Sequence, residues 1–301
     1  MTSNIAAARV FPPLAIPAPV KTLFDDITFA HVAAAHISTA TNTTVTIEDT
    51  VTQDMLDKVT ALRMFTGEPE KITSLQGIGH MRNLREVILE HQFITRLPDD
   101  MRTLTKLTVL HFVNCALKSI PDWIGNFTSL TTLNLSAQLP LGAMRGSVPE
   151  SIGNLTMLER FDVGNNNNLC GKLPDSFAGL TAVKHLLVQS NGFEDLTVLN
   201  AMPSTTNINA RNQALGTFDL GRVEKKALFL PIRLPEVFVQ AQTEGDVLYD
   251  DGVSILDSED AYLDRNMRYV HLPIHTPGTF EVTLVTHGRL TSVSYRYTVP
   301  D

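Results

Sequence analysis

One short apolar pattern recurs along most of the chain, and it constrains the fold more than any other feature of the sequence. Each copy has the form apolar-x-x-apolar-x-apolar. The clear copies place their apolar residues at Val59, Leu62 and Met64; Leu84, Val87 and Leu89; Leu107, Leu110 and Phe112; Leu130, Leu133 and Leu135; Leu158, Phe161 and Val163; and Val183, Leu186 and Val188. A weaker copy runs through Thr205, Ile208 and Ala210. Successive copies start 25, 23, 23, 28, 25 and 22 residues apart, within the range of roughly 20 to 29 residues typical of solenoids that add one strand per coil.

This spacing predicts a leucine-rich-repeat solenoid of α/β class. Each apolar-x-apolar segment should form a short parallel strand whose inward side chains stack on those of the next coil. The position after each strand holds a residue that can satisfy backbone groups inside the turn: Gln92, Cys115, Gln138, Asn166, Asn191 and Gln213. Cys115 is therefore expected to be a buried turn residue, and no disulfide with Cys170 is expected. We place the solenoid, with about seven coils and a concave face of parallel strands, over residues 59–215.

The segments between the strands predict the convex side. Pro98, Pro121, Pro149 and Pro174 are each followed by an acidic residue, which favours a short helix beginning at each proline. Residues 72–78 and 193–199 instead indicate short connections, and the extra residues 138–145 indicate a protruding loop. The phrases around Pro149 and Pro174, which have the form G-x-[VL]-P, resemble plant-type leucine-rich repeats.

The residues before the first coil predict a helical cap over residues 20–58, preceded by a flexible segment at 1–19. Apolar residues follow helical spacing at Leu23, Phe24, Ile27, Ala30, Ala34 and Ile37, and Thr52 can N-cap a second helix over 53–58. Such a cap would cover the core of the first coil. The order Val51-Thr52-Gln53-Asp54, Leu56-Asp57 and Ile72-Thr73-Ser74-Leu75 resembles internalins and related bacterial surface proteins over roughly residues 16–110.

Residues 216–301 predict a small β-sandwich. Strand signals occur at 228–230, 237–239, 269–272, 280–286 and 291–299. The resemblance to internalins implies that this module is immunoglobulin-like and closes the far end of the solenoid. His271 and His275 share a strand face, and residues 246–264 are acidic, but neither has a complete ligand set, so no metal is expected.

Composition and motifs argue against several functions. The chain carries 32 acidic and 24 basic residues, a net charge of -8, which does not favour nucleic acid or anionic lipid. No apolar run is long enough to span a bilayer. No H-E-x-x-H, G-x-S-x-G or C-x-x-C motif occurs, and we expect neither catalysis nor a cofactor. Neither a secretory signal nor a wall anchor is seen, so the sequence reads as an intracellular protein or as a mature fragment.

Side chains that alternate with the core residues of the strands should point away from the core and line the concave face. The predicted binding residues are Arg63, Phe65, Glu86, Ile88, Glu90, His91, His111, Val113, Asn134, Arg160, Asp162, His185, Leu187, Gln189, Asn209 and Arg211. Apolar and aromatic members of this set have no folding reason to be exposed there, and such mixed surfaces suit protein recognition. The loop 138–145 and the β-sandwich are rival surfaces.

These features predict a secreted or surface-attached monomer that binds a protein, of the host for example, through its concave face. The alternative is a structural or glycan-associated envelope protein in which the repeats act as a spacer.

Overall fold

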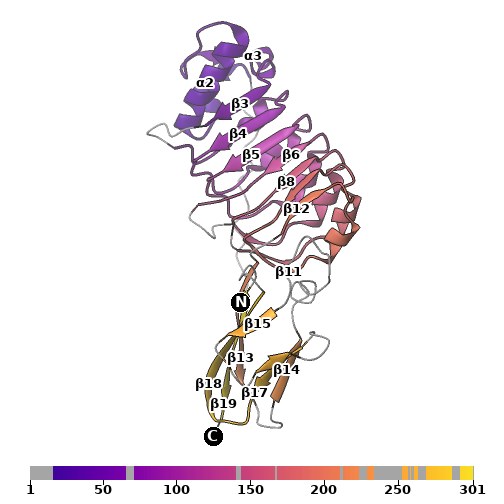
Figure 1. Ribbon diagram of the computed structural model, residues 1–301. Coiled ribbons are helices and arrows are strands. Elements are labelled where there is room, and N and C mark those ends of the chain that lie inside the picture. The colour runs from indigo at the N-terminus through magenta and orange to yellow at the C-terminus, as the bar shows by residue number, and fades with distance from the viewer. Residues whose placement is uncertain are drawn as a thin grey trace, which may run out of the picture.

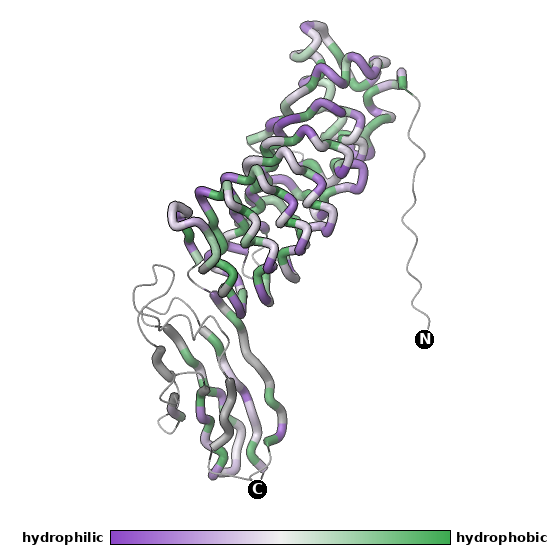
Figure 2. The backbone as a smooth tube through the Cα atoms, turned by 90° about the vertical axis from the view of Figure 1, so that its right-hand side faces the viewer, coloured by the Kyte–Doolittle hydropathy of each residue, from purple (hydrophilic) through white to green (hydrophobic). Residues whose placement is uncertain are grey.

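The computed structural model is an elongated stack of coils with helices at one end and a pair of small sheets at the other (Figure 1). It describes residues 16–65, 71–139, 144–166, 168–210, 213–223, 229–233, 253–256, 258, 261–263, 269–286 and 292–300. Viewed from the side, the coils lie next to one another along the long axis (Figure 2). Within the described part of the chain, no helix combines the length and the apolar character needed to cross a membrane.

A parallel sheet with one strand from each coil forms the concave side, as the repeat predicts. Its strands are β3 (Ala61–Met64), β4 (Glu86–Glu90), β5 (Val109–Val113), β6 (Thr132–Asn134), β8 (Arg160–Asp162), β10 (His185–Leu187) and β12 (Asn207–Asn209), in the order β12-β10-β8-β6-β5-β4-β3. Leu62 pairs with Val87 and Val87 with Leu110. This register keeps the second residue of each strand in one row, which is buried from β3 to β10 and half-buried at Ile208 of β12, so the inward side chains of neighbouring coils form a single core.

The predicted turn residues after the strands are all buried, and their side chains, five amides and the Cys115 thiol, bond the backbone of their own coil and the one before it. The Gln138 side chain accepts from Leu117 N (3.1 Å) and donates to Phe112 O (2.7 Å) and Ser136 O (3.0 Å). Five of these turns are closed by a residue with a left-handed backbone just before the buried one: His91, Asn114, Ala137, Asn165 and Ser190. Cys115 is also buried, and burial raises the pKa of its thiol to about 11, so this thiol is a packing residue.

The convex side carries 3-10 helices, which are tighter than the α-helix. They form at the predicted prolines as η2 (Asp99–Thr103), η3 (Asp122–Asn126), η4 (Glu150–Asn154) and η5 (Asp175–Gly179). Helices of the same kind, η1 (Ile78–His80) and η6 (Thr197–Ala201), begin at the last residue of the predicted connection 72–78 and within the predicted connection 193–199. All the coils between the first and the last therefore share one convex construction.

A second parallel sheet, which the sequence analysis did not predict, follows the turns of the later coils. It consists of β7 (Arg145–Gly146), β9 (Asn168–Lys172) and β11 (Gly192–Asp195), in the order β11-β9-β7. Both ends of the predicted 138–145 loop belong to the coil, because Gln138 and Met144 are buried and Arg145 begins β7. Residues 140–143 lie outside the described residues.

The N-terminal segment contains two helices where the sequence predicts one, followed by the short helix predicted after Thr52. Helix α1 (Val20–Leu23) ends at an extended Phe24, and Asp26 N-caps α2 (Ile27–Thr41) by accepting from Phe29 N (2.9 Å). Ile27, predicted to face the core, is 52% exposed because it begins the new helix. Thr52 caps α3 (Gln53–Asp57), and strands β1 (Ala18–Pro19) and β2 (Thr50–Val51) pair beside these helices.

Asp26 also ties this segment to the first coil. Its second carboxylate oxygen accepts from Thr73 N (2.7 Å), Thr73 Oγ1 (2.7 Å) and Ser74 N (3.2 Å). Burial alone would raise the pKa of this carboxyl, but the hydrogen bonds from Thr73, Phe29 and Ser74 outweigh it and leave the pKa lowered. One side chain thus joins the start of α2 to the convex turn of the first coil.

The C-terminal residues form two sheets. One has the order β13-β19-β18-β15, from Ala214–Arg222, Ser292–Val299, Gly278–Thr286 and Val253–Leu256; the other has the order β14-β17-β16, from Phe229–Arg233, Tyr269–Pro273 and Tyr262–Leu263. The buried Tyr297 of β19 donates its hydroxyl to Pro273 O (2.8 Å) and joins the sheets. Four of the predicted strands fall on β14, β17, β18 and β19, whereas residues 237–239 and most of 246–264 lie outside the described residues.

Candidate binding face

The outward residues of the concave strands form rows that cross the coils. One row contains Arg63, Ile88, His111, Asn134, Asp162, Leu187 and Asn209, each paired in register with the next. A second row contains Glu86, Val109, Thr132, Arg160, His185 and Asn207. Residues more than a hundred positions apart in the sequence therefore lie on one continuous face (Figure 1).

The predicted binding residues differ in how far they reach into solvent. Arg63, Phe65, His91 and His185 are exposed; Glu86, Ile88, Glu90, His111, Val113, Arg160, Leu187, Gln189 and Asn209 are half-buried; Asn134 and Asp162 are buried. His91 lies in the turn beyond β4, where its backbone N–H donates to Val113 O (3.0 Å), so it borders the face. Arg211 lies outside the described residues.

The charges on this face pair with one another. Arg63 forms an ion pair with Glu86, and Arg160 contacts Asp162 at 2.8 Å. Glu90 Oε1 lies 3.1 Å from His111 Nε2. The two arginines are therefore neutralised by acidic neighbours, and Glu90 keeps its charge with His111 as a hydrogen-bond partner, so the face has no strong field of either sign.

Asn134 and Asp162 bind their own strand ends, a role that the sequence analysis missed. Asn134 Oδ1 accepts from Ser136 N (3.1 Å) and Ser136 Oγ (2.8 Å), and Asp162 Oδ1 accepts from Gly164 N (3.1 Å). The Asn134 amide nitrogen must then face His111 Nδ1, at 3.5 Å, so His111 carries its proton on Nε2 and donates to Glu90. These buried side chains shape the face and offer a partner little surface.

Apolar side chains occupy the part of the concave face that lies between the charged residues. Ile88, Val113 and Leu187 are half-buried on the face, and Phe65 at its edge is 53% exposed. Two further exposed apolar side chains, Phe93 (60%) and Leu139 (42%), lie on the flank just past the strands and were not predicted. The signal for them is their position, since each directly follows a buried turn glutamine.

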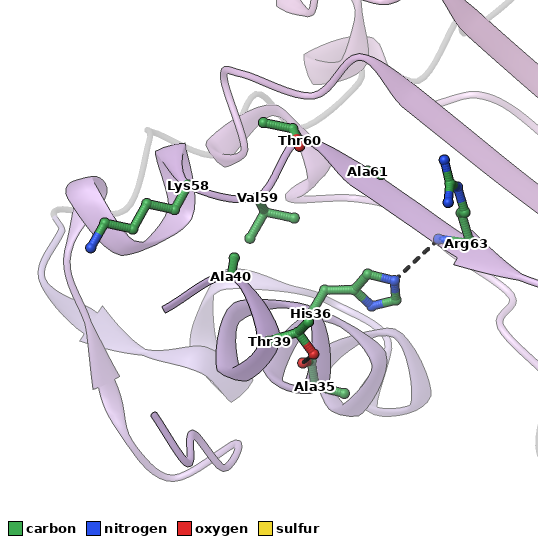
Figure 3. A pocket seen from close by; sticks show the side chains of 9 residues that line it. All are labelled: Ala35, His36, Thr39, Ala40, Lys58, Val59, Thr60, Ala61 and Arg63. Atoms are coloured by element: carbon green, nitrogen blue, oxygen red, sulfur yellow. Dashed lines mark hydrogen bonds between the residues drawn. The ribbon is translucent and has the colours of Figure 1, made fainter. Parts of the chain in front are cut away.

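A groove of about 400 Å³ lies between α2 and β3, at the edge of the concave sheet. Figure 3 shows the His36 imidazole pointing from α2 to the backbone of Arg63, whose N–H donates to His36 Nε2 (3.2 Å). His36 Nδ1 bonds Val32 O (2.9 Å), so this histidine joins helix to strand. No cluster of three or more potential metal ligands occurs among the described residues.

These features, a parallel concave sheet, buried turn amides and one convex helix per coil, define a leucine-rich-repeat protein. No family model matches the chain. A segment of 101 residues, 33% of the chain, is 34% identical to receptor-like protein 53 of Arabidopsis thaliana, and covers 10% of that protein. The chain thus spans about a tenth of the length of this plant relative.

Comparison with solved structures gives the fold. A secreted internalin-like protein of Listeria monocytogenes superposes with a TM-score of 0.67 at 17% identity, over 95% of this chain and 99% of that one. An internalin C2 from the same organism gives a TM-score of 0.47 at 24% identity, over 68% of this chain and 91% of the other. The chain is accordingly an internalin-like leucine-rich-repeat protein in its fold.

Proposed function

We propose that this protein recognises another protein through its concave face and that it catalyses no reaction. The observation that carries the proposal is a contrast on that face: the charged side chains have partners, whereas apolar side chains are partly exposed. Arg63 and Arg160 have acidic partners on the face and Glu90 bonds His111, whereas Ile88, Val113 and Leu187 remain partly open to solvent. Burying such apolar groups under a partner is favourable, at roughly 25 cal/mol per Å², and no displacement of ion pairs is needed.

The two ends of the solenoid are also consistent with a protein-recognition module. The helices α1 to α3 cover the first coil through Asp26 and His36, and we propose that they act as its cap. The two C-terminal sheets, joined by Tyr297, support an immunoglobulin-like module at the other end. We propose that the protein is a monomer that lies outside the cell or at its surface; the likeness to a secreted internalin-like protein supports this location.

The proposal is tested by removing the exposed apolar groups while keeping the ion pairs. In the double variant Ile88→Ser/Leu187→Ser, we expect capture of a host protein from a surface-protein preparation to be lost. The matched control is Met157→Ser, which removes an apolar side chain that is 55% exposed outside the concave strands. If the double variant captures the same protein as the control does, the concave face is not the binding surface.

The alternative, an envelope spacer that contacts glycans, makes a different prediction for the same variants. A spacer would bind isolated cell-wall polysaccharide equally well with and without the Ile88→Ser/Leu187→Ser changes. Binding of the unmodified protein to such polysaccharide, unaffected by these changes and without capture of any protein, would favour the spacer.

A further inference from the structure

The flank of the solenoid beside the concave face carries a strip of apolar side chains, formed by Phe93, Ala116 and Leu139. Each follows the buried turn residue of its coil, so the three occupy equivalent positions in neighbouring coils. Ala116 N donates to Ile94 O (3.2 Å), and Leu139 N donates to Cys115 O, which places the three coils side by side there. Phe93 and Leu139 are among the most exposed large apolar side chains of the described residues.

A basic row, Arg96, Lys118 and Arg145, runs along the same flank. Lys118 N donates to Thr95 O (3.1 Å) and Arg145 N donates to Lys118 O (2.9 Å), so the row crosses the same coils as the flank strip. All three side chains are exposed. For Arg96 and Lys118, the described part of the chain supplies no ion-pair partner. This differs from the concave face, where the charges are paired.

We propose that this flank binds an acidic, amphipathic segment of a protein partner. Apolar side chains of the segment would cover the flank strip, and its carboxylates would meet Arg96 and Lys118. Exposed apolar area and unpaired cations side by side match such a segment in both respects. An anionic bilayer offers similar groups, but the net charge of -8 on the chain opposes approach to it. The surface is separate from the concave face and does not depend on the function proposed for that face.

The test uses a short fluorescein-labelled peptide with leucines on one helical face and glutamates on the other, and a second peptide with lysines in place of the glutamates. Fluorescence anisotropy should show that the glutamate peptide binds and the lysine peptide does not, and binding should weaken as salt is added. In Arg96→Glu/Lys118→Glu, we expect the affinity to fall about tenfold or more, where tenfold corresponds to about 1.4 kcal/mol.

Lys58→Glu/Lys106→Glu is the charge-matched control, because both lysines are exposed and lie away from the flank. It should leave peptide affinity unchanged, as should the concave variant Ile88→Ser/Leu187→Ser, so the two surfaces are tested separately. Phe93→Ser/Leu139→Ser should weaken binding, with circular dichroism as the check on folding. Equal binding of both peptides, an equal loss in the control, or binding to phosphatidylserine vesicles without binding to the peptide would each overturn the proposal.

Discussion

Adding a single methyl group at Gly125 should separate two coils on the convex side. Gly125 belongs to η3, and a Cβ there would lie 2.2 Å from the backbone oxygen of Ser151 in the next coil and 2.9 Å from its carbonyl carbon. Because the obstacle is backbone, relief requires the two coils to move apart by about 1 Å, given that carbon and oxygen are in contact at roughly 3.3 Å. Overpacking of this kind typically destabilises by about 1–3 kcal/mol. We expect the upper half of that range for Gly125→Ala, about 2–3 kcal/mol.

Gly179→Ala provides the matched control. Gly179 also lies in a convex 3-10 helix, but a Cβ there meets nothing within 4 Å. Alanine at such a position restricts the unfolded chain, so Gly179→Ala should be neutral or stabilise by about 0.4–1 kcal/mol. In η5, the residue that aligns with Gly125 is Ala178 rather than a glycine. This alanine agrees with a looser approach of the next coil to η5.

Urea unfolding measures both variants with two probes. The only tryptophan of the chain, Trp123, lies in η3 itself, so its fluorescence reports unfolding at this helix. Far-ultraviolet circular dichroism reports the loss of secondary structure over the whole chain. Gly125→Ala should shift the midpoint to lower urea by both probes, and Gly179→Ala should not. Equal midpoints for Gly125→Ala and the unchanged protein would show that the coils do not pack as closely as this reasoning requires.

Three further changes test the parts that hold the coils together. Asp26→Asn should reduce stability by about 1–2 kcal/mol at neutral pH, as expected for bonds to a charged carboxylate; because the folded pKa of Asp26 lies below 3.8, the difference from the unchanged protein should persist to about pH 4 and vanish as pH falls further. A variant whose deficit stays constant down to pH 2 would contradict this sign. Ala137→Asn, at a backbone φ of 54°, should raise the free energy of unfolding by about 0.5–1 kcal/mol and so move the urea midpoint upward, and a lowered midpoint would refute the strain argument. Gln138→Met should lower stability by about 2–4 kcal/mol, since it strands the N–H of Leu117 and two carbonyls; a neutral result would deny the amide its role.

The concave sheet could be predicted because its register follows from the repeat itself. Leu62, Val87 and Leu110 must share a row if each coil is to bury the face of the one before it. The buried turn amides could be predicted for the same reason, since they recur at one position of every coil. The second sheet could not, because β7 is only Arg145–Gly146 and has no apolar alternation to mark it.

Local capping and side-chain bonding account for most other differences. The helix predicted from residue 20 is interrupted because Asp26 binds the amides of Phe29 and Thr73, and apolar spacing carries no information about that choice. Asn134 and Asp162 lie in the outward row, as predicted, but turn back to amides two residues later. The exposed Phe93 and Leu139 become visible only when the coils are aligned on their turn residues.

Covalent footprinting of the protein with and without its captured partner tests the central claim, recognition through the concave face, most directly. Carbene labelling modifies exposed side chains irrespective of charge, and mass spectrometry locates the labels. We predict that partner binding protects Ile88, Val113, Leu187 and His185 and leaves Met157 labelled as before. Protection confined to the C-terminal sheets or to the convex helices, with the four concave residues still labelled, would contradict the account.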